Sequence, residues 1–158
     1  MTTGTPTVLT ASGQWTEASE ALAVTLAEFL ADPAAGGRAV RLAPTDDRAL
    51  LVPHLSQVER VDVEFPVFSD GRGYSLASLL RRRHGFEGDL RAVGDVLVDQ
   101  LFALKRVGFS SFAVRADQDR ARAIAALATF SDAYQGAVDE PLPAFRRHAR
   151  PSAAQLRP

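Results

Sequence analysis

Between residues 40 and 135, four strand-like runs alternate with four helix-like segments, and this alternation constrains the fold more than any other feature. The apolar runs that suit strands cover 40–43, 60–68, 90–94 and 109–115. Alternation of this kind predicts a parallel sheet whose strands are joined by right-handed crossovers. Because the successive units carry no sign of a strand-order reversal, we expect a mainly parallel α/β fold resembling half of a TIM (βα)₈ barrel. The alternative is an open three-layer α/β sandwich.

Leucine spacing and capping residues place the other elements. Thr16 is expected to cap a helix that runs to residue 31, and Pro53 to interrupt the helix that contains Leu50 and Leu55. Asp95 and Asp117 are expected to cap two later helices. The remaining predictions are a short edge strand over 7–10 and helices over 76–84, 96–106 and 117–134.

The length of 158 residues indicates a single domain. Its α/β core is predicted at 37–136. Residues 1–36 are expected to add a strand and a helix as an N-terminal extension. Residues 137–158, rich in proline and arginine, are expected to form an extended tail suited to wrapping a neighbour.

The composition excludes several classes of function. The net charge of −1 provides no field that would attract nucleic acid or an anionic membrane. The absence of cysteine excludes thiolate metal sites, cysteine-ligated iron–sulfur clusters and a cysteine nucleophile, and the three histidines show no metal-ligand spacing. No signal peptide and no run of about 18 apolar residues is present. We therefore expect a cytoplasmic protein that binds no metal, nucleic acid or membrane.

Charged residues lie at the predicted carboxyl ends of three strands, where ligands of α/β proteins usually bind. Asp70 and Arg72 follow one strand, Asp95 follows the next, and Arg115 follows the last. The amides of the glycine-containing turn and the N-terminus of the following helix add partial positive charge. These features predict a site for phosphate, sulfate, sulfite or a carboxylate. The expected anion-binding residues are Gly71, Arg72, Gly73, Tyr74, Ser75 and Arg115.

Each candidate also has a structural explanation. Asp70 can bond its own backbone in a common Asp-Gly turn whose glycines supply positive φ angles. Asp95 is either a proton-transferring acid or a helix cap, and Arg115 either binds an anion or pairs with Asp95 or Asp117. The turn is not a dinucleotide fingerprint, because position 76 is leucine.

The stretch from Phe65 to Phe112 resembles a bacterial family known as domain of unknown function 934, and the likeness covers roughly residues 40–147. The matching pieces are Phe65-Pro66-Val67-Phe68-Ser69-Asp70-Gly71-Arg72-Gly73-Tyr74-Ser75, Asp89-Leu90-Arg91-Ala92-Val93-Gly94-Asp95-Val96-Leu97, Asp99-Gln100-Leu101, Gly108-Phe109 and Tyr134-Gln135-Gly136.

The resemblance implies an accessory protein or oxidoreductase component of assimilatory sulfite reduction, since members of the family are described as encoded beside sulfite reductase. Its partners would be sulfite reductase or the electron donor of that enzyme. The alternative is a non-enzymatic dimeric scaffold. The resemblance leaves the cofactor unknown, and an oxidoreductase would have to bind a redox cofactor, because no side chain of this chain stores electrons. Val107 and Ser110 depart from the family pattern, in which cysteine and an acid are common, and this argues against thiol-based redox chemistry. The resemblance adds Asp70, Arg91, Gly94 and Gln100 to the candidate site residues.

Overall fold

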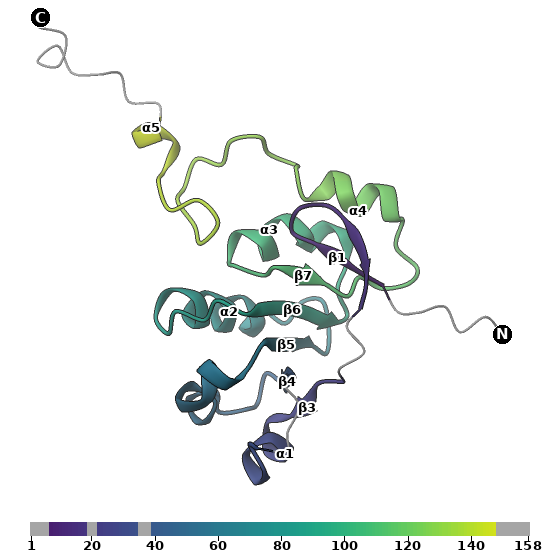
Figure 1. Cartoon of the computed structure of the whole chain (residues 1–158). Helices are drawn as coiled ribbons and strands as arrows, with labels where there is room; N and C mark the ends of the chain where they lie inside the picture. The colour runs from purple at the N-terminus through teal and green to yellow at the C-terminus, as the bar shows by residue number, and fades with distance from the viewer. Residues whose placement is uncertain (1–6, 19–21, 35–38, 148–158) are drawn as a thin grey trace, which may run out of the picture.

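The computed structural model describes residues 7–18, 22–34 and 39–147, which form one seven-stranded sheet with helices (Figure 1). The strands are β1 (Thr7–Thr10), β2 (Trp15–Glu17), β3 (Val24–Thr25), β4 (Ala39–Leu42), β5 (Arg60–Phe65), β6 (Asp89–Gly94) and β7 (Ser111–Phe112). The helices are α1 (Leu26–Ala31), α2 (Arg72–Arg82), α3 (Leu101–Arg106), α4 (Arg120–Ala126) and α5 (Ala144–Arg147). The 3-10 helices are η1 (Arg48–Leu50), η2 (Val52–Gln57) and η3 (Val98–Gln100). The α/β class is as predicted.

The strands lie in the order β2-β1-β7-β6-β5-β4-β3. Strands β3 to β7 are parallel neighbours in chain order, so this part of the sheet has no reversal, as expected. Strand β1 was predicted at an edge, and that prediction is wrong, because β1 pairs antiparallel with both β2 and β7. The outermost strands are β2 and β3, so the sheet is open, and its likeness to half a barrel stays a prediction.

Chain connectivity requires this sheet to curve. Glu17 ends β2 and Val24 begins β3, at opposite edges of the sheet. Seven residues reach at most about 25 Å. Crossing six interstrand spacings of about 4.8 Å in a flat sheet would need about 29 Å. The two edges therefore lie closer through space than along the sheet.

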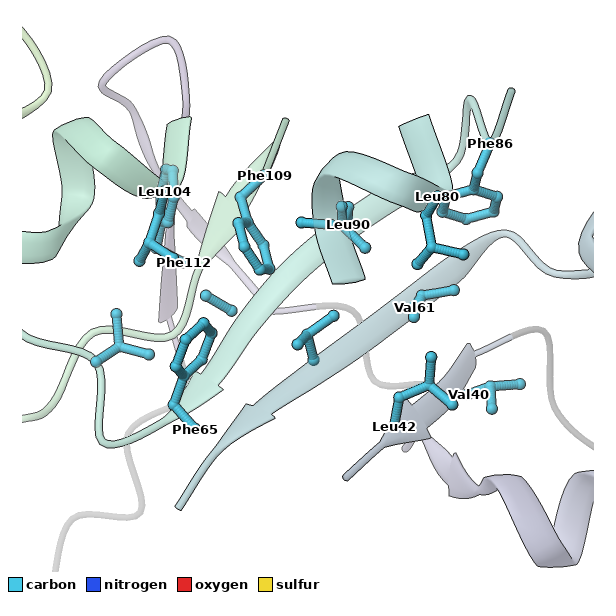
Figure 2. Close-up of a cluster of buried hydrophobic side chains, with 14 of the residues drawn as sticks. Val40, Leu42, Val61, Phe65, Leu80, Phe86, Leu90, Leu104, Phe109 and Phe112 are labelled. Atoms are coloured by element: carbon cyan, nitrogen blue, oxygen red, sulfur yellow. The ribbon is translucent and has the colours of Figure 1, made fainter. Parts of the chain in front are cut away.

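One face of the sheet carries the hydrophobic core. Alternate residues of β5, namely Val61, Val63 and Phe65, are buried against helical residues such as Leu80 of α2 and Leu104 of α3 (Figure 2). The residues of β1, β4, β6 and β7 that pair in register with this face of β5 join the same cluster, together with residues of α1 and α4. Within the described ranges, α1 to α4 thus share one core on one face of the sheet.

The opposite face carries a polar row that runs across six strands. Residues paired in register along it are Thr25, Arg41, Asp62, Arg91, Ser111 and Thr10. The buried Arg91 donates to Ser111 Oγ (3.0 Å) and pairs with Asp89 (2.9 Å). Arg60 pairs with Asp62 at 2.8 Å, but burial is the larger influence and raises the pKa of Asp62. The predicted site residue Arg91 therefore belongs to this buried network and not to the edge where Asp95 lies.

Three predicted elements differ from the structure near the N-terminus and after β7. In place of the helix predicted over 16–31, the described residues of this range form the last residues of β2, then β3 and the short α1, and residues 19–21 lie outside the described part. Thr25 caps α1 through a reciprocal capping box with Glu28. The strand predicted over 109–115 is only β7. The helix predicted to start at Asp117 starts after Asp119, which accepts the amide of Arg122 at 2.7 Å.

The interruption predicted at Pro53 agrees more closely. Pro53 lies in η2, so the segment around Leu50 and Leu55 forms two 3-10 helices and no continuous α-helix. Of the predicted tail, residues 137–147 turn back onto α3, where Arg106 pairs with Asp139 at 2.7 Å, and residues 148–158 lie outside the described part. No helix among the described residues is long and apolar enough to cross a membrane.

Candidate functional site

The candidate residues gather on loops at the carboxyl ends of β5, β6 and β7, which we call the rim (residues 66–72, 95–100 and 113–117). The parallel pairing of these strands places the loops side by side. Asp70, Arg72, Asp95 and Arg115 are all on the rim, as expected from the sequence. Arg91 is not.

Asp95 joins two neighbouring loops. Its Oδ2 accepts the backbone amide of Phe68 (2.8 Å), and its Oδ1 accepts from Arg115 (2.7 Å). The hydrogen bonds from Arg115 and from the Phe68 amide lower the pKa of Asp95 below its usual range. The alternative of a helix cap is wrong, because η3 begins after Leu97, whose amide is accepted by Gln100 Oε1 at 2.9 Å. Asp95 is therefore an ionised carboxylate that fixes the loop of Phe68.

The guanidinium of Arg115 lies between two carboxylates. It contacts Asp117 through two bonds of 2.9 and 2.5 Å and Asp95 through one of 2.7 Å. These bonds raise the pKa of Arg115 and lower that of Asp117. The structure shows the ion pairs that the sequence offered as the alternative to anion binding.

Asp70 and Arg72 form a second local pair. Asp70 accepts the Arg72 amide (3.1 Å), and its two oxygens accept from the Arg72 guanidinium at 2.7–3.3 Å. These bonds lower the pKa of Asp70. The carboxylate of Asp70 thus lies at the start of α2, where an anion is favoured. The Arg72 side chain keeps 60% of its surface exposed, so it is paired but still reachable.

The two glycines of the turn serve different purposes, and neither has a positive φ angle, which corrects that expectation. A Cβ on Gly73 would lie 2.5 Å from the Phe65 ring, so the absence of a side chain lets α2 pack on Phe65. A Cβ on Gly71 would meet nothing within 4 Å. Positive φ is instead found at Gly94 (+93°), where a Cβ would lie 2.4 Å from the Phe65 carbonyl oxygen.

Gln100 completes the rim from the other side. Its Nε2 donates to the Phe68 carbonyl (2.7 Å) and to Tyr74 Oη (3.3 Å). Burial raises the pKa of Tyr74, and its ring packs edge-on against Phe65 with centroids 5.7 Å apart. Both backbone polar groups of Phe68 are therefore held by side chains, from Asp95 and from Gln100. Val67 and Phe68 themselves remain 52% and 55% exposed.

A cleft of about 210 Å³ adjoins the rim between the loop after β4 and the first turns of α2. The sequence prediction placed Gly73 and Ser75 near an anion, and both line this cleft. It missed Arg48 and Glu64, which also line it. Glu64 falls within the strand predicted over 60–68, and Arg48 lies beyond the turn after the strand predicted over 40–43, so the sequence pattern marked neither residue. The structure ends β5 at Phe65, which brings Glu64 to the carboxyl end of that strand.

The rim is suited to holding a loop in place. The carboxylates of Asp70, Asp95 and Asp117 have lowered pKa values and accept hydrogen bonds from arginines or from backbone amides. Within the described residues, no group of three or more histidine and acidic side chains is placed to hold a metal ion. Anion binding by residues 71–75 and by Arg115, and catalysis by Asp95, stay predictions.

The fold and rim define a singly wound α/β protein whose strand ends present a fixed apolar loop. The family model described as a bacterial protein of unknown function (DUF934) matches residues 39–145, from the start of β4 into α5. The chain belongs to this family. No curated protein and no solved structure matches this chain.

Proposed function

We propose that this protein is a non-enzymatic accessory component of assimilatory sulfite reduction in the cytoplasm, which docks onto sulfite reductase or its electron donor. The family resemblance supplies the link to sulfite reduction. The docking role is supported by the position of Phe68. Its backbone amide donates to Asp95 and its carbonyl accepts from Gln100, while the residue remains exposed to solvent.

A fixed and exposed aromatic residue suits binding to another protein. Aromatic anchors dominate the binding energy of many interfaces. Holding a loop in its bound conformation lowers the entropy lost on association. Asp95 is itself fixed by Arg115, and Gln100 by the Leu97 amide, so the polar rim residues support the loop and the loop presents Val67 and Phe68.

Binding of purified protein to sulfite reductase and, separately, to its electron-donor protein tests this proposal. We expect Phe68→Ala to weaken binding by about 10- to 100-fold, equivalent to about 1.4–2.7 kcal/mol. Gln100→Ala should weaken binding through a faster off-rate, because Phe68 is present but less well held. Phe145→Ala is the matched control, since Phe145 is also a phenylalanine and is 59% exposed.

The proposal fails if the wild-type protein binds neither partner, or if Phe68→Ala and Phe145→Ala bind equally well. An oxidoreductase component remains the competing function. A bound flavin, nicotinamide or haem in protein purified from its native host would favour that competing function.

Homodimerisation is part of the same proposal. Strands β2 and β3 have one unpaired edge each among the described residues. Proteins often cover such edges, and a second copy is a common solution. Light scattering coupled to size exclusion measures the mass, and a mass of one chain at working concentration would contradict the dimer.

A further inference from the structure

The cleft beside the rim contains charged groups that the docking role does not use. It is bounded by residues 43–48 after β4, by the carboxyl end of β5 and by the first two turns of α2. The loop after β4 is fixed locally, because Asp46 accepts the Ala43 amide (2.8 Å) and Asp47 accepts the Ala49 amide (3.0 Å). Gly73 supports the opposite wall through its close packing on Phe65. The cleft is therefore formed by locally fixed segments.

The charged groups of two residues that line the cleft have no partner among the described residues. The side chains of Arg48 and Glu64 form neither a hydrogen bond nor an ion pair with each other or with any other described residue, and their hydrogen bonds are made by the backbone. The other two charged residues of the lining are engaged, since Asp46 accepts the amide of Ala43 and Arg72 pairs with Asp70. Among the described residues, one guanidinium and one carboxylate without a side-chain partner thus line the same small space.

This pattern of charges selects against a simple anion. Sulfate, sulfite or phosphate would meet Arg48 and the exposed face of Arg72, but also the repulsion of Glu64 and Asp46. A ligand that carries a carboxylate and an ammonium group would pair with Arg48 and Glu64. A volume of about 210 Å³ suits a molecule of amino-acid size and is below that of most pockets for drug-sized ligands.

We propose that this cleft binds a small zwitterion of the α-amino-acid class. Arg48 binds the ligand carboxylate, with the Ser75 hydroxyl and the Arg72 guanidinium beside it. Glu64 binds the ligand ammonium group. The remaining lining, which includes Val63, Leu76 and Leu79, contacts the ligand side chain. This site is separate from Phe68, so it stands or falls independently of the docking role.

Calorimetric titration with each standard L-amino acid tests the proposal. We expect at least one amino acid to bind, and its N-acetyl and carboxamide derivatives to bind at least about tenfold more weakly, equivalent to about 1.4 kcal/mol each. Arg48→Ala and Glu64→Gln should each weaken binding of the parent amino acid by the same factor. Arg146→Ala and Glu87→Gln, which change exposed charges elsewhere, are the matched controls.

Three other outcomes would contradict an amino-acid site in this cleft. If no amino acid binds the wild-type protein at millimolar concentration, or if the N-acetyl derivative binds as well as the parent, the proposal is wrong. Binding of sulfate or sulfite that strengthens in Glu64→Gln would show an anion site instead. Circular dichroism and the urea midpoint establish that each variant is folded. Phe68→Ala should retain amino-acid binding, which separates a failure here from a failure of the docking proposal.

Discussion

Substituting the two glycines of the rim turn tests whether the turn is built for packing or for ligand contact. Gly71 and Gly73 are two residues apart, and each is replaced by alanine in a separate variant. At Gly73 the new Cβ would lie 2.5 Å from one carbon of the Phe65 ring and 2.8 Å from another. At Gly71 it would meet nothing within 4 Å.

The expected magnitude follows from how little Phe65 can move. Its ring is 1% exposed and lies between Tyr74 and Phe109, with centroid distances of 5.7 and 5.9 Å. Forcing an extra methyl group into such a core costs about 1–3 kcal/mol. At Gly71 the lower chain entropy of the unfolded state favours alanine by about 0.4–1 kcal/mol. Gly71 is the N-cap residue of α2, and the poorer capping ability of alanine offsets part of that gain.

Urea unfolding followed by circular dichroism measures both effects. We expect Gly73→Ala to lose about 2 kcal/mol, which lowers Tm by about 4–8 °C for a chain of this size. Gly71→Ala should stay within about 0.5 kcal/mol of the wild type. If Gly73 is instead required for the close approach of a bound anion, Gly73→Ala would leave stability unchanged. That result, or an equal loss in the two variants, would refute the packing explanation.

Three further changes test other parts of the structure. Gly94→Ala should lower the free energy of unfolding, measured with urea, by at least about 2 kcal/mol. Alanine is strained at φ +93°, and its Cβ would lie 2.4 Å from the Phe65 carbonyl oxygen. An unchanged free energy of unfolding would contradict this explanation. Arg81→Ala should lower the free energy of unfolding by about 2–3 kcal/mol, because this half-buried guanidinium donates to the carbonyls of three residues at 2.5–2.9 Å. The control is Arg82→Ala, which changes an exposed arginine and should leave the free energy of unfolding unchanged. Equal urea midpoints of the two variants would refute this role of Arg81. The hydrogen-bond partners of Asp70 and Asp95 lower the pKa of each carboxyl group in the folded state. These two carboxylates therefore stabilise the fold above the unfolded-state pKa of about 3.9, and this stabilisation is lost as the pH falls through their folded-state pKa values. The urea midpoint should accordingly fall below about pH 4, less steeply in Asp95→Asn, and an unchanged acid profile in that variant would count against the pairing.

Local sequence patterns predicted the centre of the sheet because its strands are set by residues close in sequence. The runs around β4, β5 and β6 stand between clear turn residues, and Gly85 follows α2 with a positive φ of 63°. The helix predicted from Thr16 failed because its third following residue is Ser19. Thr25 has Glu28 at that position, and both halves of the capping box form. The capping-box rule alone would have favoured Thr25.

The candidate site was harder to predict, since its bonds join distant parts of the chain. The sequence predicted that Asp95 and Asp117 cap helices, but both carboxylates accept hydrogen bonds from Arg115. Asp95 also accepts the amide of Phe68, which lies 27 residues away in the sequence. Nothing next to Gln100 in the sequence indicates that it holds Phe68. The family resemblance added Gln100 to the candidate residues without giving it a role, and in the structure its side chain donates to the Phe68 carbonyl.

The position of β1 has a consequence for how the chain is made. Strand β1 pairs with β7, and Leu9 lies opposite Phe112. The backbone of β1 therefore cannot form the hydrogen bonds of this edge until about a hundred more residues have been synthesised. At synthesis rates of about 5–20 residues per second, that wait lasts on the order of 5–20 s on the ribosome. During this time the hairpin of β1 and β2 has an unpaired edge that can join another strand. A newly made chain is therefore exposed to mispairing along β1 until β7 emerges.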